Sequence, residues 1–342
     1  MPLALRLADP DGDFSAVRLA SDLHLSDRER SFAKAGDEWV LELAEPPDIE
    51  RLEYKLEVER EDGRTDWLLD PGNPQRAPGA FGDKSVLELP GYAAPGWLDE
   101  PGVPGRTDDL AVRGRGLGAH VRINVWSPED AEPGRPLRLL LANDGPEYDA
   151  LSQLTHFCAT QIAQDELPPF RVALLAPGDR DQWYSASAGY ARALANDVIP
   201  ALQRDFGVIG PPAGMGASLG GLAMLHAQRR FPTALGALFL QSSSFFMPRH
   251  DAHERRFPRY ARIVRFVRDT RRDGRYAIPV PVTLTCGIAE ENVHNNREMA
   301  NALAAQGYEV SLVEVPDLHN YVGWRDAFAP HLTALLRKAW LR

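Results

Sequence analysis

The segment that organises this sequence reads Pro212-Ala213-Gly214-Met215-Gly216-Ala217-Ser218-Leu219-Gly220-Gly221-Leu222. Within it, Gly216, Ser218 and Gly220 form a Gly-x-Ser-x-Gly motif. A serine hydroxyl is a poor nucleophile unless a base takes its proton and its Oγ stands clear of the backbone. A sharp strand-to-helix turn exposes the Oγ, and the two glycines keep that turn free of side-chain clashes. The motif predicts a nucleophilic serine; the alternative is a glycine-rich turn that only packs against a sheet.

The residues after the motif favour the nucleophile. Gly221 to Arg230 has the apolar spacing of a helix, and Phe231-Pro232 would end that helix. A turn that leads into a helix is the context in which this motif presents a catalytic serine.

Length and composition are typical of a soluble globular protein with two domains. The chain has 342 residues, of which 44% are hydrophobic and 25% are charged. No segment approaches the ~18 apolar residues that a membrane helix needs, and the N-terminus lacks the features of a signal peptide. Two cysteines, Cys158 and Cys286, are too few for a disulfide framework. We therefore expect a cytoplasmic protein that does not bind membranes and uses neither metal nor cofactor.

Charge is spread unevenly along the chain. Residues 1–100 carry 23 acidic and 11 basic side chains, a net charge of −12, whereas the remainder carries 25 and 27, a net charge of +2. The acidic first part argues against binding of nucleic acid there, and the difference favours two domains of different origin.

The first part, residues 1–98, has the alternation of an antiparallel β-sandwich. Residues 52–58 alternate apolar with charged side chains, so a strand here would bury one face and leave Glu53 and its neighbours in water. Similar short segments lie at 17–19, 39–43 and 86–89. Short strands at this spacing, separated by turn-forming residues, predict a domain of immunoglobulin-like type.

The second part predicts an α/β fold. Residues 99–118 are rich in proline and glycine and are expected to form a linker, and residues 119–342 alternate strands with helices. Strands are expected at 120–126, 137–141, 172–175, 237–240, 280–286 and 310–315. Helices are expected at 190–206, with an interruption at Pro200, and at 221–230, 292–306 and 324–341. This alternation predicts a mainly parallel sheet with helices on both faces.

In such a sheet, catalytic side chains lie on loops that leave the carboxyl ends of strands. The loops after Cys286 and Val315 carry Glu290 and His319. With Ser218, these residues occur in the serine–acid–histidine order of α/β-hydrolases. We expect His319 to take the serine proton and Glu290 to hold the imidazole.

Other residues are alternatives for the catalytic acid and for the base. Glu291 could replace Glu290 if its loop turns differently, and Asp317 lies two residues before His319. Three further histidines lie on expected helices and are not placed to deprotonate the serine: His156, His226 and His294.

Three motifs resemble the enterochelin (ferric-enterobactin) esterase family, whose α/β-hydrolase sheet is similar to those of mycolyltransferases and feruloyl esterases. They are Leu140-Leu141-Ala142-Asn143-Asp144-Gly145, Gly216 to Gly221, and Gly287-x-x-Glu290 followed by His319 and Gly323-Trp324-Arg325. The segment Trp67 to Pro74, followed by Phe81-Gly82, is similar to the N-terminal domain of that family and to glycogen-binding modules. The resemblance covers nearly the whole chain and implies a serine esterase.

The chain departs from the family pattern around the histidine. Asp317-Leu318-His319-Asn320 stands where the family often has Gly-Gly-His-Asp-Trp. We therefore expect the packing of this loop, and with it the fit of the substrate, to differ.

The oxyanion of an acyl-transfer intermediate needs two N–H donors. The first is expected from Leu219, at the start of the helix after the serine. The second is expected from the loop that begins at Asp144, where Pro146 has no N–H and Gly145 is our choice.

The basic segment from Ser242 to Arg275 is expected to form the rim of the pocket. Ten arginines lie between 249 and 275, and apolar residues at 263–267 thread through them, so an amphipathic helix whose arginines face water would explain the pattern. The alternative is a cap that attracts an anionic ester. Four residues could line the same mouth: Arg180, Trp183, Tyr184 and His253.

These observations predict a carboxylic ester hydrolase that acts on a small-molecule ester, of siderophore type or with another aryl or acyl group. Two alternatives use the same sequence features. An acyltransferase of mycolyltransferase type would employ the same three residues, and a non-catalytic glycan-binding protein would make the serine motif a coincidence.

Overall fold

The computed structural model describes residues 3–43, 48–132, 134–272, 274 and 278–341. The chain forms two compact units. The β unit comprises Met1–Ala93 together with two later loops, Gly287–Glu291 and Val315–Gly323. The α/β unit comprises Ala94–Cys286, Asn292–Glu314 and Trp324–Arg342. The loops predicted to carry the catalytic acid and base therefore belong to the same unit as the N-terminal residues.

The β unit contains two antiparallel sheets, as predicted. One has the strand order β1-β4-β3, and the other has the order β2-β5-β8-β7 with β6 beside β5. The strands are β1 (Leu3–Ala8), β2 (Phe14–Ser21), β3 (Ala33–Ala35), β4 (Glu38–Leu43), β5 (Arg51–Arg60), β6 (Thr65–Leu68), β7 (Arg76–Ala77) and β8 (Lys84–Glu88). Alternate side chains of β1, β4 and β5 share one buried apolar core with residues of β2. The alternation of apolar and polar residues in the sequence therefore predicts which side chains form this core.

Strand β5 differs from its prediction at one end. Leu52, Tyr54 and Leu56 are buried as expected, but Arg51 and Glu53 are buried too. The Nη1 atom of Arg51 donates to Oε1 of Glu53 at 2.7 Å, so the two charges enter the interior as a pair. Apolar alternation could not reveal this pair, because ion pairing rather than hydrophobicity removes these side chains from water.

The α/β unit is built on an eight-stranded sheet with the order β16-β15-β14-β13-β11-β12-β10-β9. The strands are β9 (Gly105–Gly114), β10 (Ala119–Pro128), β11 (Arg138–Asn143), β12 (Phe170–Leu175), β13 (Ala213–Ala217), β14 (Ala237–Gln241), β15 (Pro281–Gly287) and β16 (Glu309–Val315). Strand β10 is antiparallel to both neighbours, and the pairs from β12 to β15 are parallel. The α/β prediction is confirmed.

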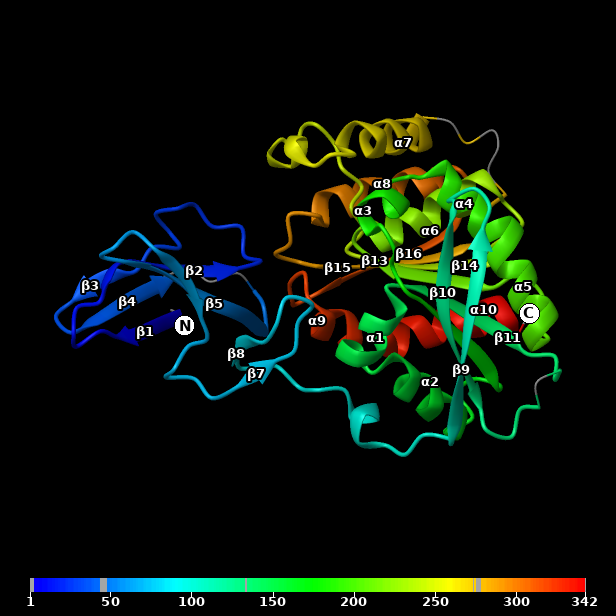
Figure 1. The fold of residues 1–342 in the computed structure, drawn as a ribbon, viewed down its shortest axis with the longest axis horizontal. Helices are drawn as coiled ribbons and strands as arrows, with labels where there is room; N and C mark the ends of the chain where they lie inside the picture. The colour runs from blue at the N-terminus through cyan, green and yellow to red at the C-terminus, as the bar shows by residue number, and fades with distance from the viewer. Residues whose placement is uncertain (1–2, 44–47, 133, 273, 275–277, 342) are drawn as a thin grey trace. The chain divides into compact units, whose positions relative to one another are not determined.

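Helices cover both faces of this sheet. Figure 1 shows α6 and α8 on one face and α1 and α10 on the other. The helices are α1 (Gly145–Ser152), α2 (Leu154–Ala163), α3 (Arg180–Tyr184), α4 (Ala188–Ala193), α5 (Ile199–Phe206), α6 (Leu219–Arg230), α7 (Tyr260–Arg272), α8 (Val293–Ala305), α9 (Tyr321–Asp326) and α10 (Thr333–Trp340). Within the described part of the chain, every helix is too short or too polar to span a membrane.

Two segments differ from the sequence prediction, and a third follows it. The expected linker 99–118 contains β9, a polar edge strand whose proline and glycine neighbours conceal it. The interruption expected at Pro200 is present: a π-helical segment, Leu194–Val198, divides the helix at 190–206 just before this proline. The expected helix at 324–341 is interrupted at Ala329, which precedes Pro330 and has extended backbone angles. Proline cannot donate the backbone hydrogen bond that a continuous helix requires, which accounts for both interruptions.

Candidate active site

Ser218 occupies a strained turn between β13 and α6. Its backbone angles are φ 54° and ψ −124°, a conformation that few non-glycine residues adopt. A Cβ on Gly216 would lie 2.5 Å from the carbonyl carbon of Gly220, so a side chain at 216 would collide with the backbone of the next turn. The glycine before the serine is therefore a packing requirement. This is the geometry that sets a serine Oγ clear of its own backbone.

The Ser218 hydroxyl has a polar neighbour that the sequence analysis did not single out. Its Oγ lies 3.0 Å from the Oγ of Ser244, and the backbone N–H of Ser244 donates to the carbonyl of Ser218 at 3.1 Å. Ser244 follows β14, the strand next to β13. The sequence signal that could have indicated Ser244 is its position shortly after the strand that lies next to β13.

His319 and Glu290 are brought together within the β unit. The Nδ1 atom of His319 lies 2.9 Å from Oε2 of Glu290. A carboxylate oxygen accepts this bond, so Nδ1 carries the proton, and in the neutral ring Nε2 keeps its lone pair. This is the tautomer that a general base needs.

The Glu290 carboxylate is buried and has a second donor. Its Oε1 atom accepts from the backbone N–H of Gly287 at 2.8 Å. A Cβ on Gly287 would lie 2.2 Å from the carbonyl oxygen of Asp317, so glycine is what allows the two loops to approach this closely. Each carboxylate oxygen therefore has a donor, which offsets the cost of burying the group.

The two other carboxylates considered near His319, Glu291 and Asp317, do not take the place of Glu290. Glu291 is exposed. Asp317 is buried, and its Oδ1 accepts from the backbone N–H of Leu318 at 2.7 Å and from Nδ2 of Asn320 at 2.8 Å. Burial raises the pKa of Asp317 to about 6, although these hydrogen bonds act in the opposite direction.

Glu290 also sets the charge state of His319. Burial alone would lower the pKa of this histidine, but the charge and hydrogen bond of Glu290 outweigh it, with smaller contributions from Asp22 and Glu291, so the pKa is raised above its ordinary value of 6.5. The side chain is still 29% exposed. A raised pKa strengthens the imidazole as a base, provided that the pH lies above it.

The expected oxyanion donors belong to the starts of two helices. Leu219 is the first residue of α6 and Gly145 the first of α1, so neither N–H has a partner within its own helix. Asn143, two residues before Gly145, contacts the start of α6, because its Nδ2 donates to the carbonyl of Gly220 at 2.9 Å. Its Oδ1 accepts from the hydroxyl of Tyr190 in α4 at 2.5 Å. The role of Leu219 and Gly145 as donors remains a prediction.

Arg180 is fixed beside the start of α1. Its Nε and Nη2 atoms donate to the two carboxylate oxygens of Asp144, each at 2.9 Å, and its guanidinium lies over the ring of Tyr184. Trp183 and Tyr184 are buried, and the Tyr184 hydroxyl accepts from the N–H of Asp144 at 3.2 Å. Only Arg180 of these three presents a partly exposed side chain; contact of any of them with substrate stays a prediction.

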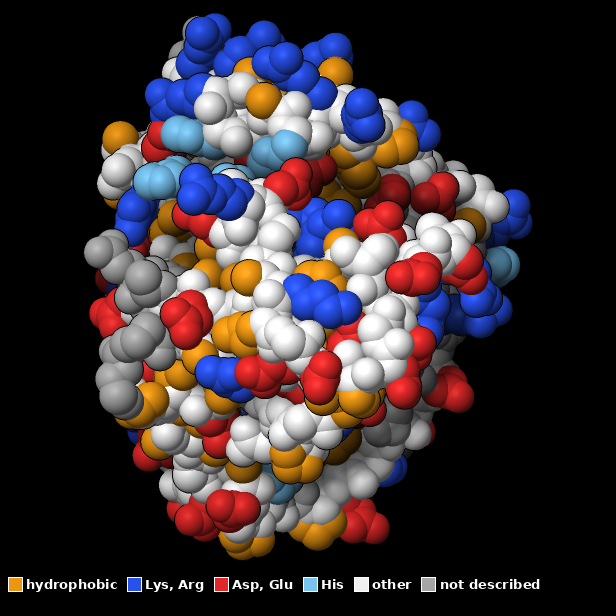
Figure 2. Space-filling view, turned by 90° about the vertical axis from the view of Figure 1, so that its left-hand side faces the viewer, with side chains coloured by type: hydrophobic (Ala, Val, Ile, Leu, Met, Phe, Trp, Pro, Cys, Tyr) orange, Lys and Arg blue, Asp and Glu red, His pale blue; other side chains and the backbone are white. Residues whose placement is uncertain are grey.

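The basic segment forms an amphipathic helix. In α7, Ile263, Val267 and Thr270 are buried, and Figure 2 shows Lys and Arg side chains gathered over this part of the molecule. Its exposed arginines, with those of the preceding residues, are Arg249, Arg255, Arg256, Arg259, Arg265, Arg268, Arg271 and Arg272. Arg275 lies outside the described residues. Arg262 is the exception, since it donates to the carbonyls of Gln182 and Ser185 and so ties α7 to the segment of Arg180.

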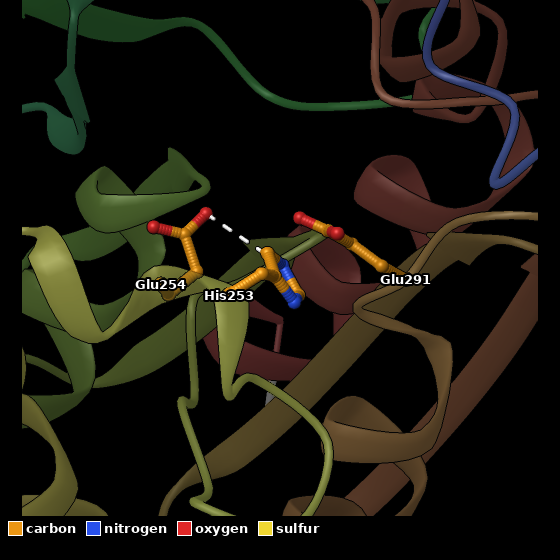
Figure 3. Close-up of side chains that lie close together, drawn as sticks. All are labelled: His253, Glu254 and Glu291. Atoms are coloured by element: carbon orange, nitrogen blue, oxygen red, sulfur yellow. Dashed lines mark ion pairs between the residues drawn. The ribbon is translucent and has the colours of Figure 1, made fainter. Parts of the chain in front are cut away.

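His253 lies on the short 3₁₀ turn before α7. It is exposed, and its Nε2 lies 4.0 Å from Oε1 of Glu254 (Figure 3). Its contact with substrate remains a prediction.

The three histidines on helices, which were not expected to deprotonate the serine, contact other parts of the protein. His226 packs edge-on against Phe266, and burial lowers its pKa to about 4. His156 contacts the carbonyl of Leu98, and His294 stacks on His250.

A family comparison identifies the type of enzyme to which this geometry belongs. The family model described as "Putative esterase" matches residues 114–335, more than half of the chain. The chain belongs to the esterase family. It is a carboxylic ester hydrolase. Among curated proteins, no sequence matches this esterase.

Solved structures share the fold of the esterase. The enterochelin esterase of Shigella flexneri has 20% sequence identity, with 98% of this chain and 93% of that chain covered and a TM-score of 0.73. The ferric enterobactin esterase of Salmonella typhimurium gives the same identity, coverage and TM-score. A ferulic acid esterase covers 70% of this chain and 99% of its own, with 16% identity and a TM-score of 0.59. The predicted resemblance is confirmed in two ways: the family model gives the esterase family, and the enterochelin esterase structures give the fold.

The histidine–carboxylate pair predicts a measurable titration. By NMR, the ring of His319 should titrate above pH 6.5, whereas His226 serves as an internal control and should titrate near 4. In Glu290→Gln the pKa of His319 should fall, because the carboxylate charge is lost and burial remains. An unchanged His319 pKa in that variant would contradict the pairing.

Proposed function

We propose that the esterase cleaves its substrate through an acyl-enzyme on Ser218, with His319 as general base and acid and Glu290 as the group that orients the imidazole. The observation that carries this proposal is the 2.9 Å hydrogen bond between His319 Nδ1 and Glu290 Oε2, which leaves Nε2 as the proton acceptor.

The sheet supports the convergence of the three residues. Ser218 comes directly after β13, Glu290 three residues after β15, and His319 four residues after β16, all in one sheet. In open α/β sheets, the loops at the carboxyl ends of strands form the reaction site.

Each step then follows from these groups. Oγ of Ser218 attacks the ester carbonyl as Nε2 of His319 takes its proton, and a bond forms between Oγ and the carbonyl carbon. The oxyanion would be held by the N–H groups of Leu219 and Gly145. When the bond to the leaving alcohol breaks, the imidazolium returns its proton to that oxygen. Water, deprotonated by the same imidazole, then releases the acid and restores the serine.

The substrate that we propose is an aryl or siderophore-type ester with acidic character. Structures of the enterobactin esterase with the same fold include one in the presence of enterobactin, and another structural neighbour is a ferulic acid esterase. The exposed arginines of α7 would raise the local concentration of an anionic ester. Transfer of the acyl group to an alcohol in place of water uses the same residues and is the alternative reaction.

Replacement of the nucleophile tests the proposal. Ser218→Ala should lower kcat on a p-nitrophenyl ester by at least about 10³-fold, because no acyl-enzyme can form. In the wild type, kcat/KM should rise with pH through a pKa above 6.5, since only neutral His319 accepts a proton. Thermal unfolding at the wild-type temperature would show that the variant is folded. Full activity of that folded variant would overturn the mechanism.

A second candidate function concerns the β unit. Trp67 is 60% exposed and Phe81 97% exposed, and both line a hollow of about 670 Å³. The same hollow presents polar groups of Ser21, Asp22 and Lys55. Exposed aromatic faces beside hydrogen-bonding groups suit the stacking of a sugar ring, so we propose that this hollow binds a carbohydrate.

Affinity electrophoresis through gels containing glycogen tests this binding. The wild-type protein should be retarded, and Trp67→Ala should migrate as in a gel without glycogen, because the stacking surface is lost. Leu69→Ala is the matched control, since Leu69 is also exposed but does not line the hollow. Equal migration of wild type and Trp67→Ala would remove the proposal.

A further inference from the structure

A buried arginine of the β unit is bonded to the loop that carries His319. Arg51 is 3% exposed, and its Nη1 donates to Glu53 at 2.7 Å and to Oδ1 of Asn320 at 3.5 Å. Asn320 directly follows His319 in the chain. A side chain of strand β5 therefore reaches the residue next to the histidine.

The loop around His319 is braced by its own polar side chains. Oδ1 of Asp317 accepts from the side-chain amide of Asn320 at 2.8 Å, and Oδ1 of Asn320 accepts from the N–H of Gly323 at 2.7 Å. A Cβ on Gly323 would lie 2.9 Å from the carboxyl carbon of Asp317. Asn320 is thus the point at which the internal bracing of the loop and the contact from Arg51 meet.

Two further contacts fix the residues before His319. The backbone N–H of Glu50 donates to the carbonyl of Pro316 at 2.8 Å, and Leu318 is 1% exposed within the apolar core of the β unit. Leu318 and Asn320 lie in the segment where the sequence departs from the Gly-Gly-His-Asp-Trp pattern. The departure therefore coincides with the residues that anchor the loop.

Stability alone does not explain the buried charges. Glu53 is 2% exposed, and besides Arg51 it has Lys84 at 3.5 Å, which in turn pairs with Asp22 at 3.2 Å. The desolvation of a buried ion pair largely cancels its attraction, so apolar side chains of similar size would stabilise a strand about as well. What the pair supplies is a fixed direction for the Arg51 guanidinium, which points to Asn320.

We propose that Arg51 is a positioning residue for His319, acting through Asn320 to hold the imidazole against Glu290. This inference rests on the function proposed above. Loss of the guanidinium would let the loop around Asn320 move, and the imidazole would spend less time in line with its carboxylate partner. The N-terminal strand would then be part of the catalytic apparatus without touching substrate.

Kinetics of arginine variants test the inference. Arg51→Met should lower kcat on a p-nitrophenyl ester by about 10- to 100-fold, as expected for a small misplacement of a catalytic group, with KM little changed. Arg51→Lys should recover part of kcat, because an ammonium can also donate to Asn320. Arg60→Met is the matched control: Arg60 lies at the other end of β5, pairs with Asp66 at 2.6 Å, and should leave kcat unchanged.

Two further readouts separate positioning from folding. Asn320→Ala should lower kcat at least as much as Arg51→Met, because it also removes the bonds to Asp317 and Gly323. The double variant Arg51→Met/Asn320→Ala should lose no more than Asn320→Ala alone, because Arg51 acts only through Asn320. In Arg51→Met the NMR pKa of His319 should also fall as its ring leaves Glu290, a result that does not depend on catalysis. If Arg51→Met fails to fold, the kcat and the His319 pKa of Arg51→Gln, which removes the guanidinium but keeps a polar side chain, decide the question.

The possible outcomes are distinct. Wild-type kcat and His319 pKa in folded Arg51→Met, or wild-type kcat in Asn320→Ala, would overturn the positioning role even if Ser218→Ala is inactive. Full activity of Ser218→Ala would overturn the proposed function. The His319 pKa in Arg51→Met would then still show whether Arg51 positions the ring.

Discussion

The bond between His319 Nδ1 and the Glu290 carboxylate is the interaction on which the proposed chemistry depends. It fixes one tautomer of the imidazole, raises its pKa and turns Nε2 into the proton acceptor. The carboxylate can be buried because a backbone N–H, that of Gly287, satisfies its other oxygen.

This bond lies in the β unit, and the nucleophile lies in the α/β unit. The sheet of the α/β unit provides the strained turn for Ser218, while the loops of the acid and base pack with the N-terminal strands. The acidic N-terminal part of the chain is therefore more than an appended module. Its core receives Leu318, and two consecutive residues, Glu50 and the first residue of β5, Arg51, contact the histidine loop. A covalent separation of the two parts would remove these supports from the base.

The sequence was sufficient to predict the elements that follow simple periodic rules. Alternation in β5 and the compact apolar strands of the sheet predicted the two architectures, and the glycines around Ser218 predicted the strained turn. The pairing of His319 with Glu290 followed from the rule that active-site loops leave the ends of strands. Glu53 was predicted to face water, because a charged residue in an alternating strand normally lies on the exposed face. It is buried because it pairs with Arg51, and the alternation of apolar and charged residues does not show which side chains form such a pair. Ser244 and Arg51 were missed for the same reason, since their contacts depend on tertiary packing.

The most direct test of the central claim is to map the covalent adduct formed with a fluorophosphonate by mass spectrometry and to measure its rate of formation. The proposed mechanism predicts a single adduct on Ser218 in the wild type. It also predicts that His319→Ala slows this reaction by at least about 10³-fold, because the hydroxyl has lost its base. An adduct on another residue, or labelling of Ser218 at the wild-type rate in folded His319→Ala, would contradict it.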